Sequence, residues 1–93
     1  MTETLTETTV GELSGVRVGL ANVWERDYVD SGGTTRHGLT ARLAWTDAGG
    51  TERWEVVGVG SQLEFAGSAW QVTRIEKVAG TPGEVVWERV TAG

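Results

Sequence analysis

Five tryptophans are spread along this 93-residue chain, each within a run where apolar or β-branched residues tend to alternate with polar ones. Most of these runs are separated by glycine-containing turns, and the chain holds 14 glycines and one proline. A two-residue period is that of a β-strand, because successive side chains point to opposite faces. No stretch shows the apolar period of about 3.6 residues that marks an amphipathic helix. The pattern predicts an all-β protein.

Glycine turns predict how the strands pair. A two-residue turn at Gly32-Gly33 would place Leu20 opposite Trp45 and Trp24 opposite Ala41. Directly opposed residues share one face of a sheet. The turn chemistry and the apolar pattern therefore predict the same pairing.

The next connection, Asp47–Gly50, leads to a strand over 51–57. A loop of two or of four residues would place Trp54 on the face of Leu43 and Trp45. Only a three-residue loop would turn Trp54 to the other face, because a one-residue slip inverts every side chain. We therefore expect Trp45, Trp54 and Trp70 in the core, while the sequence leaves the sides of Trp24 and Trp87 undecided.

The C-terminal part predicts two more hairpins. A turn at Ala66-Gly67 pairs Leu63 with Trp70, and a change of apolar parity predicts a β-bulge near Thr73-Arg74. Thr81–Glu84 has the proline-then-glycine order of a type II turn. A last strand is expected over 85–90.

Together these segments predict a small antiparallel meander of about six strands, curled into a barrel or a two-layer sandwich. Curling is expected because an open sheet would leave two exposed edges. Residues 13–93 form one β domain in this interpretation. Residues 1–12, rich in Thr and Glu, are either a flexible tail or an edge strand over Thr4–Val10.

The net charge of −5, with the arginines spread singly along the chain, argues against a nucleic-acid partner. The absence of cysteine excludes disulfides and thiolate chemistry. No apolar run approaches the roughly 20 residues that span a bilayer, and residues 1–10 lack the pattern of a signal peptide. We expect a cytoplasmic protein without a membrane partner. The preference for arginine over lysine indicates a GC-rich bacterial genome.

No motif predicts catalysis, a metal or a cofactor. His37 is the single imidazole, and the predicted register places it opposite Tyr28, which favours a solvent-facing pair over a catalytic one. Asp27-x-x-Asp30 lacks the ligand spacing of a calcium loop, and one histidine does not supply a zinc site. Gly58-x-Gly60 lacks the third glycine of a dinucleotide fingerprint.

Two kinds of binding surface are open to such a chain. The strands around the Gly32-Gly33 turn are long enough for a hairpin arm to project and contact another protein, and the arm would present Tyr28, Val29, Asp30, Arg36 and His37. The alternative is a small-ligand site at a tryptophan-lined barrel mouth. It would use three residues: Asn22, Trp24 and Trp87.

The stretch 57–72, with a glycine bend, a short strand and Gly-x-x-Trp-x-Val, resembles a pattern of short actinobacterial all-β proteins of unknown function. The resemblance covers the C-terminal half and implies a small β fold without an active site. The expectation is a non-catalytic β module of the accessory or immunity type that binds another protein. A homodimer through an exposed strand edge is a further possibility, and an enzyme centred on His37 is the remaining alternative.

Overall fold

The computed structural model describes residues 2–90, and every regular element in that range is a β-strand. The strands are β1 (Thr2–Thr6), β2 (Val10–Leu13), β3 (Val16–Val29), β4 (Thr35–Thr46), β5 (Glu52–Gly58), β6 (Gln62–Phe65), β7 (Ser68–Glu76) and β8 (Glu84–Val90). The all-β prediction is confirmed. The predicted count was too low by the two N-terminal strands.

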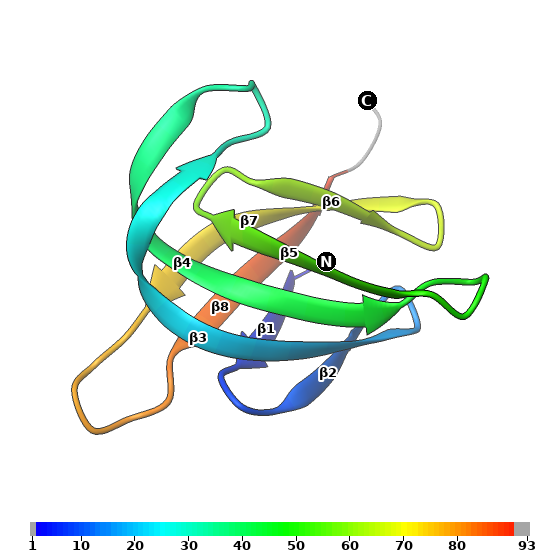
Figure 1. Cartoon of the computed structure of the whole chain (residues 1–93), viewed down its shortest axis with the longest axis horizontal. Helices are drawn as coiled ribbons and strands as arrows, with labels where there is room; N and C mark the ends of the chain where they lie inside the picture. Colours follow the sequence, from blue (N-terminus) through cyan, green and yellow to red (C-terminus); the bar gives the residue numbers. More distant parts are fainter. Residues whose placement is uncertain (1, 91–93) are drawn as a thin grey trace.

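The strands form two four-stranded antiparallel sheets, in the orders β1-β8-β7-β6 and β2-β3-β4-β5 (Figure 1). We call them the β8 sheet and the β3 sheet. The β3 sheet curls strongly across the β8 sheet, which lies behind it in Figure 1. Backbone hydrogen bonds beyond the strand ends extend two ladders of the β8 sheet, from Glu7 N to Gly83 O at 2.8 Å beside β1 and β8 and from Val72 N to Ser61 O at 2.9 Å beside β6 and β7.

Residues 2–13 are strands rather than a flexible tail. Strand β1 pairs with β8 along its whole length, and β2 pairs with the start of β3. Leu5 and Leu13 anchor these strands because both are buried in the core. The edge-strand alternative was therefore the better one, although a turn at 7–9 divides it into two strands. Residue 1 and residues 91–93 lie outside the described range.

The core lies between the inner faces of the two sheets. Trp70 and Trp87 are its largest members, 1% and 0% exposed. At the rim, the half-buried Trp45 meets Phe65 of the other sheet edge to face, with ring centroids 5.1 Å apart. The full cluster is Leu5, Leu13, Val18, Leu20, Val23, Ala41, Leu43, Val57, Phe65, Trp70, Val72, Ile75, Val85 and Trp87.

Two hairpin loops have the same sequence pattern, Asp-x-Gly-Gly-Thr, at 30–34 and 47–51. In each, Oδ1 of the aspartate accepts hydrogen bonds at 2.9–3.0 Å from the backbone N–H groups two and four residues further on. The second glycine of each has a φ of 81°, which suits glycine because it has no Cβ. Both are three-residue loops, in which a turn is followed by a left-handed residue.

These loops overturn the predicted registers. Leu20 lies opposite Leu43, not Trp45, and Trp24 lies opposite Thr40, not Ala41. Ala44 lies opposite Trp54, so the β4–β5 loop is the three-residue case that turns β5 over. The aspartate cap is the physical reason, because it stabilises the three-residue loop over a two-residue glycine turn. At the second loop, the Arg53 guanidinium and the N–H groups of Thr51 and Gly49 lower the pKa of Asp47.

A β-bulge in β3 compensates for the first loop. Asn22 and Val23 together occupy the place opposite Ala41, and Asn22 has a φ of 54°. On the N-terminal side of the bulge, the even-numbered residues of β3, such as Leu20, face the core as predicted. Only the stretch between bulge and loop is inverted.

Glu7 holds the bulge in place. Its Oε2 accepts a hydrogen bond from Val23 N at 3.0 Å, and its Oε1 accepts one from Gly83 N at 2.9 Å. Lys77 also pairs with this carboxylate. The Lys77 ammonium and the Gly83 and Val23 N–H groups together lower the pKa of Glu7 from 4.5 to about 2. Glu7 therefore connects the β1–β2 turn, the bulge and the segment before β8.

The C-terminal hairpin follows the prediction more closely. Leu63 lies opposite Trp70, and the register shifts between Val72 and Arg74, which confirms both the turn and the bulge. The predicted type II turn at 81–84 is wrong. The hydrogen-bonded turn runs from Val78 to Thr81, with Gly80 at a φ of 83°. Gly83 instead packs against Val23, where a Cβ would lie 2.7 Å from the valine side chain.

Trp70→Phe should destabilise the protein more than Trp87→Phe, by about 1 kcal/mol. Both changes remove the same part of a buried ring. However, Trp70 Nε1 donates to Ser14 Oγ at 2.9 Å, whereas Trp87 Nε1 has no hydrogen-bond partner among the described residues. Urea unfolding of the two variants measures the difference. Equal losses of stability would contradict the assigned roles of the two indole N–H groups.

Glu7→Gln should lower the free energy of unfolding at pH 7 by about 1–3 kcal/mol. The folded-state pKa of Glu7 is lowered, so its stabilisation is fully present above the ordinary pKa of 4.5 and is lost as the pH falls toward about 2. The difference between wild type and variant should therefore disappear near pH 2. Unfolding curves at several pH values test this, with the exposed Glu12→Gln as the control of equal charge. A loss of stability that does not change with pH would contradict it.

Candidate functional site

The outer face of the β3 sheet carries two exposed tryptophans. Trp24 is 55% exposed and Trp54 is 58% exposed, so the prediction that Trp54 belongs to the core is wrong. Both lie outside because the three-residue loops turned their strand segments over. A large aromatic side chain that stays exposed on a sheet face is a common binding anchor.

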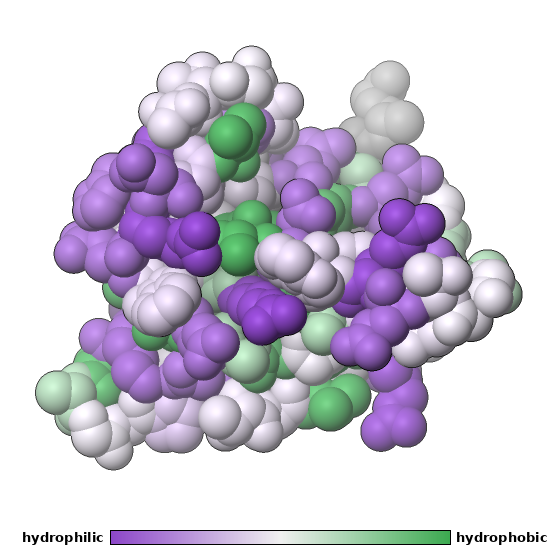
Figure 2. Space-filling view, in the orientation of Figure 1, coloured by the Kyte–Doolittle hydropathy of each residue, from purple (hydrophilic) through white to green (hydrophobic). Residues whose placement is uncertain are grey.

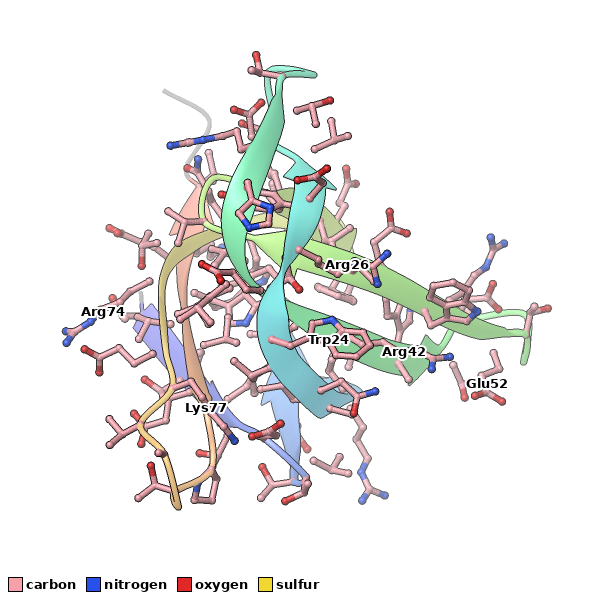
Figure 3. All side chains as sticks on the ribbon, turned by 60° about the vertical axis from the view of Figure 1, so that its left-hand side comes forward. Trp24, Arg26, Arg42, Glu52, Arg74 and Lys77 are labelled. Carbon is pink, nitrogen blue, oxygen red and sulfur yellow. The ribbon has the colours of Figure 1, made fainter. Side chains whose placement is uncertain are left out.

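An arginine lies over each ring. Arg26 Cζ is 5.9 Å from the centroid of Trp24, and Arg42 Cζ is 4.7 Å from that of Trp54. Each cation–π contact contributes about 0.5–1 kcal/mol at an exposed site and holds the guanidinium in place. Figure 3 shows Trp24, Arg26 and Arg42 on the same side of the β3–β4 ribbon, away from Arg74 and Lys77.

These side chains surround a shallow hollow of about 290 Å³. We call its lining the Trp–Arg face, which consists of Asn22, Trp24, Arg26, Arg42, Trp54 and Val56. In the view of Figure 2, near-white and green surface lies among purple polar residues over the β3 sheet. The face can offer aromatic surface, guanidinium donors and one side-chain amide to a bound group.

Asn22 reaches this face by way of the bulge. The predicted register placed it on the core side opposite Leu43, which is wrong, because Leu43 pairs with Leu20 and Asn22 is exposed. An asparagine tolerates the left-handed backbone of the bulge better than most residues do. Thr40 Oγ1 donates to Trp24 O at 3.0 Å and ties Trp24 of β3 to β4 just after the bulge.

Trp87 does not belong to any mouth or cleft. It is fully buried between the sheets, opposite Val72 on β7 and Glu3 on β1. The predicted ligand set of Asn22, Trp24 and Trp87 is therefore divided, with its first two members on the Trp–Arg face and the third in the core. Alternation places Trp87 inward because it shares a face with Val85.

The β3–β4 hairpin projects at the upper left of Figure 1, but its base is fixed to the β5–β6 turn. Tyr28 is 8% exposed, and its hydroxyl donates to Val59 O at 2.8 Å. A Cβ on Gly58 would lie only 2.4 Å from the Tyr28 ring, so the ring packs closely over this glycine. Ser61 Oγ donates to Val29 O at 3.1 Å. The arm is therefore a clamped element, and Tyr28 is not presented to a partner.

The other residues predicted for the arm have different settings. Val29, Arg36 and His37 are exposed. The side chain of Asp30 is 18% exposed and lies 3.9 Å from Arg36, besides capping its own loop. The structure thus brings Asp30 and Arg36 together but commits the aspartate to the hairpin.

His37 lies opposite Asp27, not Tyr28, as a consequence of the corrected register. Its Nδ1 is 2.7 Å from Asp27 Oδ1, and both side chains are well exposed. Neither side chain lines the hollow of the Trp–Arg face or the larger space at the other end of β3 and β4. Among residues 2–90 no group of three or more His, Asp or Glu side chains is placed to hold a metal ion.

A larger open space of about 820 Å³ lies at the other end of β3 and β4. It touches Ala44 and Gly19 on the outer face but also Trp45 and Phe65 on the inner one. Since neighbouring residues of a strand point to opposite faces, this space wraps around the sheet end. It is therefore not a single binding chamber, and the Trp–Arg face is the better candidate.

Comparisons of the chain with family models, with curated proteins and with solved structures find no match. The part of the chain that the structure describes contains no helix able to cross a membrane.

One sequence signal for this face was missed. The repeated Asp-x-Gly-Gly-Thr pattern, followed after one residue by arginine, occurs at 30–36 and 47–53. An aspartate at the start of a tight turn accepts hydrogen bonds from the loop backbone. Recognising that cap in both loops would have predicted two three-residue loops and an exposed Trp54.

Replacing both Trp24 and Trp54 by phenylalanine should shift the tryptophan emission to shorter wavelength and reduce its quenching by acrylamide. The reason is that Trp70 and Trp87 are buried and Trp45 is half-buried. Steady-state fluorescence with an acrylamide titration measures both effects. Trp70→Phe is the control, which should not reduce quenching because it removes a buried emitter. A double variant quenched as strongly as the wild type would show that these two rings are not the exposed ones.

Proposed function

We propose that this protein is a non-catalytic binding module that contacts another protein through the Trp–Arg face. The single observation that supports this most is the pair of tryptophans, both more than half exposed, on the outer face of one sheet. Tryptophan and arginine are the residue types most enriched among side chains that dominate binding energy. This proposal keeps the class of function expected from the sequence and moves its site from the hairpin arm to the sheet.

The exposed rings of Trp24 and Trp54 carry a free-energy cost in water. Each leaves apolar area in water, and covering such area is favourable by about 25 cal/mol per Å². The stacked Arg26 and Arg42 restrict how each ring can move, so less conformational freedom is lost on binding. The β-ladders beneath them hold the two rings in a defined spacing.

The composition supports a bacterial source with a GC-rich genome, since seven basic residues are arginine and one is lysine. The absence of cysteine is compatible with a reducing cytoplasm. We place the module there, as an accessory or immunity-type protein.

The test is co-purification of a partner with the tagged protein from its source cells, with chemical cross-linking. The Trp24→Ser/Trp54→Ser double variant should lose a protein that the wild type retains, with a fall of at least tenfold. The fold should persist because both side chains project from the sheet surface.

Val78→Ser is the matched control, because Val78 is 66% exposed but lies in the turn before β8, away from the Trp–Arg face. It should retain the partner. Equal retention by the double variant, or no partner with the wild type, would overturn the proposal.

A small-ligand module is the second candidate, because the hollow brings Asn22 and Trp24 of the predicted ligand set together with two arginines. Its volume of about 290 Å³ is at the low end for ligand sites. A small anion with an aromatic ring fits that lining best. Quenching of Trp24 emission by such a compound, lost on Asn22→Ala, would favour this function over the first.

A further inference from the structure

The arginines of the Trp–Arg face have no acidic partner within the described chain. Arg36, Arg53 and Arg74 each pair with an aspartate or glutamate. Arg26 and Arg42 form no ion pair or hydrogen bond with any residue of 2–90, and neither does Arg17. Their guanidinium donors are therefore available to a partner.

The registers place these three arginines on one face of the molecule. Residues directly opposite share a face, so the outer face of the β3 sheet holds four arginines and two glutamates: Arg17, Arg26, Arg36, Arg42, Glu12 and Glu52. The outer face of the β8 sheet holds four glutamates and one arginine: Glu64, Glu76, Glu84, Glu88 and Arg74. The net charge of −5 thus conceals a locally basic face.

Apolar side chains and a low floor lie beside the arginines. Val10, Gly19, Ala44 and Trp54 are directly opposed neighbours across the four strands of the β3 sheet. Val10 and Trp54 are both 58% exposed, whereas the two residues between them are small. A Cβ on Gly19 would meet only Ala44 O, at 3.8 Å. The row therefore forms a trough in which a partner's apolar side chain can lie.

We propose that the partner of this face is an acidic segment of another protein, with aspartate or glutamate side chains interspersed with apolar ones. This inference rests on the proposed function and names the chemistry of its partner. Carboxylates accept paired hydrogen bonds from the free guanidinium groups of Arg26 and Arg42. Apolar side chains cover Trp24, Trp54 and the trough.

Charge complementarity also favours a segment confined to the face. The acidic remainder of the molecule repels an anionic partner everywhere else and orients it toward the arginines. A nucleic acid is less suitable, because its continuous phosphate backbone would extend past the arginines to Glu12 and Glu52. Figure 3 shows Glu52 beyond Arg42, toward the β4–β5 loop.

The experiment is titration calorimetry of the whole protein with synthetic peptides of about twelve residues, long enough to cross strands that lie about 4.8 Å apart. The test peptide repeats Glu-Glu-Leu, and the peptides for comparison repeat Gln-Gln-Leu and Lys-Lys-Leu. Oligothymidylate of similar length tests a phosphate backbone.

The acidic peptide should bind at least about tenfold more tightly than the neutral one, and its binding should weaken at high salt because exposed charges are screened. Arg42→Gln should weaken binding several-fold. Arg89→Gln should not, because Arg89 is an exposed arginine of the β8 sheet that forms no ion pair with any of residues 2–90. Trp24→Ser should also weaken it, which provides a second variant.

Equal binding of acidic and neutral peptides, or no binding, overturns the inference. So does binding that Arg42→Gln leaves unchanged, or tighter binding of oligothymidylate. Sedimentation of the protein alone tests whether the acidic surface belongs to a second copy of this chain. Self-association that both Arg42→Gln and Glu88→Gln abolish would overturn the inference of an acidic segment from another protein. If the acidic peptide fails while the co-purified protein is still lost on Trp24→Ser/Trp54→Ser, the acidic class is wrong and the proposed function stands.

Discussion

The hydrogen bonds inside two hairpin loops determine most of what is distinctive in this structure. Asp30 and Asp47 each cap their loop by accepting two backbone N–H groups through Oδ1, at 2.9–3.0 Å. This cap makes each loop three residues long. Because side chains alternate with a period of two, one extra loop residue turns the paired strand over. The cap therefore decides which residues of β3 and β5 face solvent.

The bulge in β3 makes the first of these shifts compatible with a core. Without it, Val18 and Leu20 would face outward with Trp24. Because Asn22 and Val23 together lie opposite Ala41, Val18 and Leu20 return to the inside, where both are nearly fully buried. The bulge removes the Val23 N–H from the ladder. The Glu7 carboxylate accepts a hydrogen bond from this N–H and another from Gly83 N. Loop, bulge and carboxylate thus act together to confine the inversion to one end of β3.

The candidate site is a product of that confined inversion. Trp24 and Arg26 lie outside because they belong to the inverted stretch between the bulge and the three-residue loop. Trp54 lies outside because β5 has no compensating bulge among its ladder pairs. Arg42, on the intervening strand, completes the face. Tyr28 shows the limit of the same rule: it is also turned outward, yet the β5–β6 turn covers it and Val59 O accepts its hydroxyl. A position on the outer face therefore gave exposure for Trp24 but burial for Tyr28.

The sequence by itself determined the β class, the bulge near Thr73-Arg74, the Leu63–Trp70 pairing and the burial of Trp70. Alternation and turn residues are local signals, and these elements depend on little else. Only the tertiary structure decided that Trp54 and Trp24 lie outside, that Trp87 lies inside and that residues 2–13 form strands paired with distant segments. Each of these depends on a one-residue choice of loop length or bulge, or on a partner far along the chain. A shift of one residue leaves the local composition unchanged, yet it exchanges the core face for the solvent-exposed face.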